Sequence, residues 1–408
     1  MTLTVDHYPD SLHKLDSQLA QAQQAHPGTR ATVLARALID GAIRLDLERA
    51  RVLGLVASYK EHGVVRDADH PPEFEHPDGR SGIGTDNPAH PLPDGEHWNE
   101  GRRATLTGAV YGTDDKSRPL NPYMNTGLTG RGMMWLYGPN HCIDNGVLEI
   151  AADEQSQPVL NIIGIRRKDD AQKRPALSGG FAKFMQADDG SYFFDEEAIL
   201  ETRLEEFFEE MVSDSVPLLP AYAARVEGEF AEAVQSAGSR SGGALSPERI
   251  HELRDQTVVA LKLEQVRALD PGFLARLKDF LAQGHECFAG PVLSSGRATN
   301  NAWIESRMNW VMLDEATWKH IAGNGPFDYK LSGGDDSDGV FHFPVTPETI
   351  KSALPSHGPM MTYMLASFLL DAQERNIDLH PNIMRQLEDI ADFYSPSAAV
   401  PPPVPAPQ

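Results

Sequence analysis

The chain has 408 residues, of which 40% are hydrophobic and 23% are charged, and its formal net charge at pH 7 is −23. This length allows a large hydrophobic core and two or three structural units. The acidic balance excludes a nucleic acid as the expected partner, because phosphate backbones are bound by basic surfaces.

Cysteine content and apolar patterning indicate the compartment. Two cysteines, Cys142 and Cys287, are too few to staple a fold of this size, so we expect a reducing environment. The first ten residues lack the basic and apolar segments of a signal peptide. The longest apolar stretch, Met360 to Leu370, is too short to span a bilayer. We therefore expect a cytoplasmic protein with no membrane partner.

Residues 1–66 are predicted to form a helical N-terminal region. Leu12, Leu15 and Leu19 recur at helical spacing before Pro27-Gly28 interrupts the pattern, and a second helix follows. Such a region is expected to act as a scaffold, and it is the candidate surface for a homo-oligomer.

Residues 67–118 are predicted to form a connector and a first strand. The composition shifts to proline, glycine, histidine and aspartate up to Glu100, and a strand-like pattern follows over residues 103–111. The histidines in and beside this segment lack the tight spacing of a zinc site.

The rest of the chain alternates between predicted strands and helices, which favours an α/β or α+β fold. Strands are expected at 159–165, 302–311 and 340–345, and helices at 196–212, 359–371 and 381–393. Residues 217–284 are predicted to be a helical insert, and the proline-rich segment 395–408 a disordered tail.

The helix predicted at residues 196–212 is unusually acidic. Glu206, Glu209 and Glu210 lie at spacings of three and four, so their carboxylates share one face. A second row, Glu197, Glu201, Glu205 and Glu209, follows at spacing four, and Arg203 is the one basic residue inside the helix. Carboxylate oxygens suit Mg²⁺ or Mn²⁺. The alternative interpretation is a solvated acidic face without a ligand.

The order of these glutamates resembles a known signature. Glu197 is followed by seven residues and then by Glu205-Glu206-Phe207-Phe208-Glu209-Glu210, and Gly180 precedes it. The Nudix signature has a glycine, five residues, a glutamate, seven residues and then the string R-E-U-x-E-E-x-G-U, in which U is a bulky aliphatic residue and the second glycine follows two glutamates. Four glutamates of this chain stand at the register of that signature.

A wider resemblance extends over residues 120–372. It is carried by Gly138-Pro139-Asn140-His141, by Asn301-Ala302-Trp303-Ile304-Glu305, and by shorter strings such as the glycine-rich run 126–132. The chain resembles the ADP-ribose pyrophosphatase branch of the Nudix superfamily and the related ADP-ribose-sensing domain of a cation channel. The resemblance implies a Nudix α/β/α sandwich with a mixed sheet over residues 119–394, to which the N-terminal helices and the helical insert are additions.

The resemblance also implies an activity and a set of site residues. The reaction would be metal-dependent hydrolysis of ADP-ribose, or of a related nucleoside diphosphate, to AMP and ribose 5-phosphate. Mg²⁺ or Mn²⁺ would be held by Glu206, Glu209, Glu210 and the Gly180 carbonyl, with Glu305 as an auxiliary base or cation ligand. The residues expected to contact the substrate are Arg297, Arg131, Asn140, His141 and Asn301.

The chain departs from the signature at several points. Glu205 stands at the position of the arginine, Val212 at that of the second glycine, and sixteen residues, 181–196, at that of a five-residue loop. Outside the signature, Ser295 and Leu354 replace an acidic residue and a tyrosine of the family. These changes keep two alternatives open: a weak or inactive ADP-ribose sensor, and a scaffold in which the helical additions mediate assembly.

Overall fold

A mixed sheet forms the centre of the molecule. The computed structural model describes residues 13–55, 67, 70–75, 105–132, 134, 137–168, 170–182, 185–186, 192–193, 195–241, 245–334 and 337–395. The strand order is β11-β4-β3-β10-β9, with β5 beside β4 and β6 beside β3. The strands are β3 (Gly138–Ala152), β4 (Pro158–Arg167), β5 (Pro175–Ala176), β6 (Ser178–Phe181), β9 (His285–Pro291), β10 (Ala302–Met312) and β11 (Ser337–Pro344).

The long strand β3 has different neighbours along its length. On one side it runs parallel to β10, from Gly138 opposite Ala302 to Leu148 opposite Met312. On the other side, β4 pairs antiparallel with its second half, and β6 pairs antiparallel with residues 142–145. The short strand β6 therefore pairs with the part of β3 that β4 does not reach. It places two glycines, Gly179 and Gly180, beside β3.

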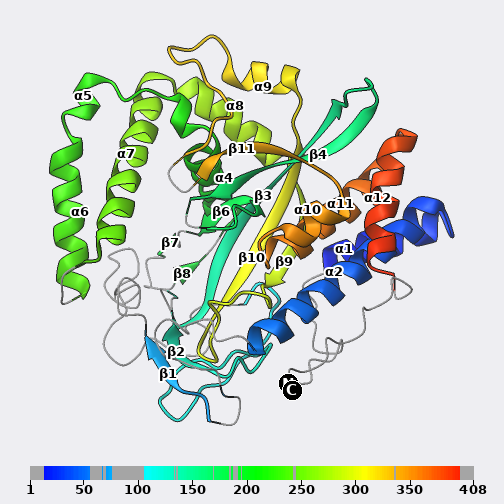
Figure 1. Ribbon diagram of the computed structural model, residues 1–408, viewed down its shortest axis with the longest axis horizontal. Helices are drawn as coiled ribbons and strands as arrows, with labels where there is room; N and C mark the ends of the chain where they lie inside the picture. Colours follow the sequence, from blue (N-terminus) through cyan, green and yellow to red (C-terminus); the bar gives the residue numbers. More distant parts are fainter. Residues whose placement is uncertain are drawn as a thin grey trace, which may run out of the picture.

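Helices cover both faces of the sheet (Figure 1). One face carries α4 (Glu196–Met211), α7 (Pro247–Leu269), α8 (Pro271–Ala282) and α9 (Glu315–Ala322). The other face carries α1 (His13–Ala25), α2 (Arg30–Leu55), α10 (Pro347–Ser352), α11 (His357–Glu374) and α12 (Pro381–Phe393). The predicted mixed α/β class, with helices on both faces and helical additions, is confirmed.

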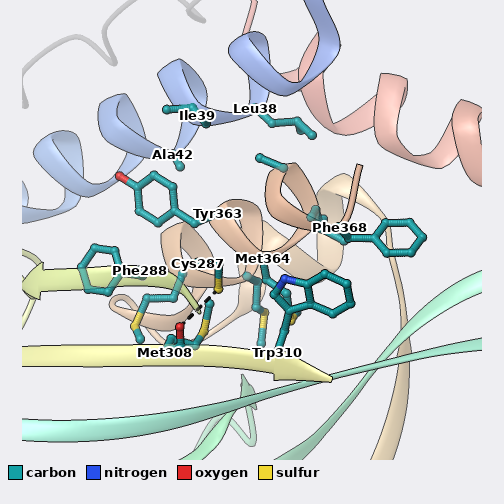
Figure 2. Close-up of a cluster of buried hydrophobic side chains, with 14 of the residues drawn as sticks. Leu38, Ile39, Ala42, Cys287, Phe288, Met308, Trp310, Tyr363, Met364 and Phe368 are labelled. Atoms are coloured by element: carbon teal, nitrogen blue, oxygen red, sulfur yellow. Dashed lines mark hydrogen bonds between the residues drawn. The ribbon is translucent and has the colours of Figure 1, made fainter. Parts of the chain in front are cut away.

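Helix α11 is the centre of the larger core. Fourteen of its residues are buried, from Gly358 to Ala372, because it is covered by the sheet on one side and by α2 on the other. Figure 2 shows Tyr363, Met364 and Phe368 between α2 and strands β9 and β10. Trp310 donates its indole N–H to Ser367 Oγ over 2.9 Å, so the polar atoms of these two buried side chains are paired.

The N-terminal helices belong to this same core. Leu15 and Leu19 of α1 and Leu34 and Leu38 of α2 are buried in the cluster around α11, whereas Val33 is 62% exposed. A helix stripe buried in this way is a continuous part of the domain. The expected helices are confirmed, and within residues 13–55 they are packed on the sheet domain.

The predicted insert is a run of helices between α4 and β9. It contains α5 (Pro220–Ala223), α6 (Val226–Ser241), α7 and α8, and α6 and α7 lie side by side at the edge of the molecule (Figure 1). The remaining elements are the strands β1 (Glu73–Glu75), β2 (Thr129–Gly132), β7 (Met185–Gln186) and β8 (Tyr192–Phe193), with one 3-10 turn at Ser213–Ser215. Strands β7 and β8 pair as a hairpin within the enlarged loop before α4.

Some expectations differ from the structure. No strand forms over residues 105–111, because the chain turns there, with Gly108 at a positive φ of 73° and Thr105 Oγ1 donating to the Ala109 carbonyl over 3.0 Å. Most of the connector, the loop tip at 187–191 and the tail from 396 lie outside the described residues. Within the described ranges, no helix has the length and apolar character needed to cross a membrane.

Candidate functional site

Helix α4 presents the acidic residues to the sheet. It begins at Asp195, whose side chain accepts a hydrogen bond from the Ala198 N–H over 2.8 Å. Its apolar stripe, which includes Leu204, Phe207 and Met211, is buried against α7, α8 and the sheet. Burial of this stripe fixes the rotation of the helix and directs the neighbouring glutamates toward β6.

Glu206 and Glu210 meet the glycine pair of β6. A Cβ atom at Gly180 would lie 2.1 Å from Glu206 Oε1, so only glycine lets this carboxylate approach the strand. The Gly179 N–H donates to Glu210 Oε2 over 2.8 Å, and Glu210 is 3% exposed. The structure thus brings together three of the predicted metal-binding residues, Glu206, Glu210 and Gly180.

Glu209 directly precedes Glu210 in α4, and its backbone is closely packed. Its carbonyl oxygen accepts a hydrogen bond from Ser213 Oγ over 2.8 Å. A Cβ at Gly334 would lie 1.5 Å from the same oxygen, so the segment before β11 presses against the end of α4. The predicted role of the Glu209 carboxylate in metal binding remains a prediction.

The second acidic row of α4 is bound to the inserted helices. Arg267 of α7 donates to Glu201 over 2.8 Å and to Glu205 over 2.9 Å. Lys278 of α8 lies 3.3 Å from both Glu197 and Glu201. The row is therefore compensated by cations of the insert, and the residue at the position of the signature arginine, Glu205, is itself an acceptor for an arginine.

Arg203 has a different structural role. It is 3% exposed, its Nε donates to Asn145 Oδ1 over 3.1 Å, and its NH1 donates to the Leu281 carbonyl over 2.6 Å. Burial lowers the pKa of Arg203 to about 10, which still leaves it charged at neutral pH. Arg203 joins α4 to β3 and α8 and does not face the glycine pair.

Basic side chains lie on the other side of Glu206 and Glu210. Arg167, at the end of β4, has its NH1 3.7 Å from Glu210 Oε1. Arg297, in the loop between β9 and β10, acts electrostatically on Cys142 together with Glu206, and on His357 together with Arg167. Arg167 beside Glu210, with the charge of Arg297 nearby, can bind an anion next to a divalent cation.

His357 is the first residue of α11, and the positive charges of both arginines act on it. Its Nδ1 accepts the Leu177 N–H over 2.7 Å, so the proton of the neutral ring is on Nε2. Burial, assisted by the positive charges of Arg167, Arg297 and Arg49, lowers the pKa of His357 to about 3. His357 is therefore a neutral hydrogen-bond donor at neutral pH.

A second group near the glycine pair was not predicted. Asp144 of β3 is 7% exposed, lies opposite Gly179 and accepts a hydrogen bond from Ser306 Oγ. Burial raises its pKa to about 6. Cys142, on the same face of β3, has its pKa raised by burial and by the charges of Asp144 and Glu206. Residues 138–152 were not recognised as a strand, and with that strand the alternation that places Cys142 and Asp144 on one face was missed.

The other predicted residues lie in buried hydrogen-bond networks. Glu305 is fully buried, and it accepts bonds from Tyr123 Oη over 3.0 Å, from Trp303 Nε1 over 2.9 Å and from the Leu106 N–H. His141 Nε2 lies 3.5 Å from Glu305 Oε2. These contacts bind β10 to the segment 105–123, and they place the Glu305 carboxylate inside the protein rather than on its surface.

The two predicted asparagines and Arg131 hold the start of strands β3 and β10. Asn301 accepts from the Gly130 N–H over 3.0 Å and donates to Asp114 and the Pro119 carbonyl. Asn140 donates to the Gly138 carbonyl over 3.1 Å, and Arg131 lies over the Tyr137 ring at 5.3 Å. All three are buried, and their role in substrate binding remains a prediction.

The donor set around Gly180 fits an incomplete site for a hard cation. In the part of the chain that the structure describes, no three or more His, Cys, Asp or Glu side chains are grouped to hold a metal ion. Two carboxylates and a backbone carbonyl are nevertheless the kind of partial set to which Mg²⁺ binds, with water and substrate phosphates supplying the remaining ligands. Such an ion would be held by Glu206, Glu210 and the Gly180 carbonyl.

Comparisons with known proteins give low similarity. A mutT/nudix family protein from Listeria innocua shares 12% identity and a TM-score of 0.27 over 59% of this chain and 98% of its own. A MutT/nudix family protein from Enterococcus faecalis shares 12% identity and the same TM-score over 61% of this chain and 68% of its own. No protein-family model and no curated protein matches the chain. These values are too low to assign a family, so function has to be argued from the site.

Proposed function

We propose that this protein is a Nudix-type hydrolase that cleaves the diphosphate of ADP-ribose, or of a related nucleoside diphosphate, into two phosphomonoesters. The observation that carries the proposal is the meeting of Glu206 and Glu210 with the glycine pair of β6, with Arg167 beside Glu210. The signature register of the glutamates led to the same residues.

The side chains divide the chemistry between them. Arg167 and Arg297 would bind the phosphate oxygens. The neutral His357 would donate a hydrogen bond from its Nε2–H group to one of these oxygens without adding charge. Glu206, Glu210 and the Gly180 carbonyl would hold Mg²⁺ or Mn²⁺, which neutralises the diphosphate and lowers the pKa of water. Attack of water on one phosphorus breaks the bond from that phosphorus to the bridging oxygen, which leaves on the other phosphate.

The test is product analysis after incubation of ADP-ribose with the protein and Mg²⁺ or Mn²⁺. We expect AMP and ribose 5-phosphate in equal amounts, and at least a hundredfold loss of rate in Glu206→Gln/Glu210→Gln. The matched control is Glu197→Gln, the same change at an exposed position of α4, which should retain activity. Equal rates in the wild type and the double variant would reject the proposal.

A second candidate function is a sensor that binds ADP-ribose without cleaving it. It is favoured by the engagement of Glu210 with Gly179 and Arg167, which leaves a metal-binding group that is incomplete within the described residues. Tight binding of ADP-ribose to the wild-type protein, with no product in the presence of any metal ion tested, would favour the sensor function.

A further inference from the structure

A cavity of about 400 Å³ lies on the side of α2 that faces α10. Its wall includes three cationic side chains from three separate elements: Arg49 of α2, Arg174 before β5, and Lys351 in the last turn of α10. Gln172 and Ser352 add neutral polar groups. Among the described residues no carboxylate lines the cavity.

This concentration of positive charge is unusual for the chain. The protein has a net charge of −23, and a second cavity, of about 610 Å³, is lined by Glu149, Asp314 and Glu315 with one cation, Lys319. Like charges that face a shared cavity repel one another, and a bound anion removes that repulsion. The cavity at Arg49 therefore has the electrostatic character of an anion site.

The contacts of the three cations show which of them can bind a ligand directly. Arg49 donates from NH1 to the Pro355 carbonyl and from NH2 to the Lys351 carbonyl, each over 2.8 Å, so it supplies mainly charge. Arg174 donates from Nε and NH2 to Asp170, each over 3.0 Å, and among the described residues its NH1 makes no hydrogen bond. Lys351 is exposed and makes no ion pair within the described part of the chain.

We propose that this cavity binds a phosphate group, as inorganic phosphate or as the phosphate of a phosphomonoester. Lys351, Arg174 and the Gln172 amide would donate hydrogen bonds to its oxygens, and Arg49 would add positive charge from behind. A volume of about 400 Å³ lies within the range of small-molecule sites and leaves room for a group attached to the phosphate. This second site is separate from Glu206 and Glu210, and it does not depend on the proposed hydrolase activity.

The turn at residues 355–357 separates the cavity from the candidate catalytic site. Arg49 is bonded to the Pro355 carbonyl, and two residues later His357 is bonded to Leu177. The positive charge of Arg49 also contributes to the lowered pKa of His357. The two sites are thus neighbours with different walls, and variants can address each one separately.

Isothermal titration of the full-length protein with inorganic phosphate, in EDTA and at constant ionic strength, tests the proposal. We expect one saturable site whose affinity falls at least tenfold in Lys351→Glu and severalfold in the milder Lys351→Gln. Lys319→Glu, a charge reversal at the other cavity, should bind phosphate as the wild type does, and Arg297→Ala should retain the binding that Lys351→Glu weakens. Thermal unfolding of each variant checks that it is folded.

Three results would overturn the proposal: no saturable binding, unchanged affinity in both Lys351 variants, or a loss of binding in Arg297→Ala. The last result would place the anion at the candidate catalytic site. Parallel titrations with AMP and ribose 5-phosphate distinguish the sources. Tighter binding of either ester that weakens in Lys351→Glu assigns the cavity to a phosphomonoester, and equal or weaker binding assigns it to phosphate itself.

Discussion

The ionisable residues near the glycine pair have pKa values shifted in opposite directions. Burial keeps the proton on Asp144 up to a pH of about 6, and it keeps His357 neutral down to about 3. Both shifts follow from the cost of placing a charge where water is excluded. Each shift links the protein's stability to pH, and the two links have opposite signs.

The sign of each link follows from proton uptake in the unfolded chain. As the pH falls below about 6.5, the unfolded chain protonates His357 and the folded protein does not, so stability falls toward acid. As the pH rises from about 3.9 to 6, the unfolded chain loses the Asp144 proton and the folded protein keeps it, so stability falls toward base. Between about pH 4 and 6 the two contributions cancel.

Replacing Asp144 by asparagine should therefore reveal the contribution of His357. We expect Asp144→Asn to gain stability above pH 7, on the order of 2 kcal/mol, because a buried carboxylate no longer has to ionise. Between pH 4.5 and 6, its free energy of unfolding should fall toward acid more steeply than that of the wild type, by at most about 1.4 kcal/mol per pH unit.

Urea unfolding in EDTA over this pH range provides the measurement. The Ser306 hydroxyl can still donate to the asparagine oxygen, so the packing is conserved. Asp115→Asn, at an exposed position, is the control and should follow the wild type. If the free energy of unfolding of Asp144→Asn and that of the wild type depended on pH in the same way, the pKa of the Asp144 carboxyl group would not be raised in the folded protein.

At the scale of elements, α4 depends on the inserted helices for its charge balance. Arg267 and Lys278 come from α7 and α8, and they bind the row of glutamates that faces away from Gly180. The charge of Glu205 is compensated by Arg267, which lies 62 residues further along the chain. The insert is thus joined to the helix that carries Glu206 and Glu210.

This arrangement changes what a substitution at Glu205 should do. Sequence comparison with the signature predicts that Glu205→Arg increases turnover. In the structure, the same change places an arginine against Arg267 and removes one of its two acceptors, so we expect Glu205→Arg to lower both stability and turnover. The paired change Glu205→Arg/Arg267→Glu restores opposite charges and should recover most of each.

A double-mutant cycle on the rate of ADP-ribose hydrolysis and on the melting temperature checks this prediction. Exposed ion pairs contribute about 0.2–1 kcal/mol, and Glu205 is mostly buried, so a coupling near the upper end of that range is expected. Arg254→Glu, at an exposed pair with Glu227 in the same insert, is the control. Additive effects of the two single changes would contradict a stabilising interaction between Glu205 and Arg267.

At the scale of the whole molecule, α2 braces the loops that carry the site. Asp46 Oδ1 accepts the Ser294 N–H over 3.1 Å, three residues before Arg297. Arg49 donates to carbonyls of residues 350–355, just before His357. The N-terminal helices therefore help to position Arg297 and His357, in addition to the scaffold role that the sequence predicts.

Arg49→Gln should for this reason destabilise the protein. The shorter amide cannot reach all of these carbonyls, and unpaired polar groups in a partly buried location cost about 1–3 kcal/mol in the free energy of unfolding. The matched control is Arg44→Gln, an exposed position on the same helix, which should change stability by less than about 0.5 kcal/mol. Chemical denaturation measures the free energy of unfolding of both variants. Equal values for Arg49→Gln and Arg44→Gln would contradict the proposed role of Arg49 in holding residues 350–355.

The sequence predicted helices better than strands, for a physical reason. The apolar stripe of α4 and the segment Pro381–Phe393 show clear helical periodicity, and both helices were placed to within a residue. Strand β3 is covered on both faces and contains Asn140, Asp144 and Asn145, so it lacks both alternation and a continuous apolar run. Missing β3 concealed the location of Asp144.

The site was recovered in part, for a similar reason. Glu206 and Glu210 were found from their spacing because a helix fixes which residues share a face. The partners Arg267 and Asp46 could not be found in that way, because each reaches its partner across a large sequence separation. Local spacing carries no information on contacts of that kind.

The central claim is that Glu206, Glu210 and Gly180 form a partial metal site that a bound diphosphate completes. Titration of Mn²⁺, followed by the electron paramagnetic resonance of the free ion, tests it with and without a methylene analogue of ADP-ribose that resists hydrolysis. We predict weak Mn²⁺ binding to the protein alone and at least tenfold tighter binding with the analogue. Glu206→Gln/Glu210→Gln should abolish this gain, and Glu197→Gln should retain it. An Mn²⁺ affinity that the analogue leaves unchanged, or a gain that persists in the double variant, would contradict the account.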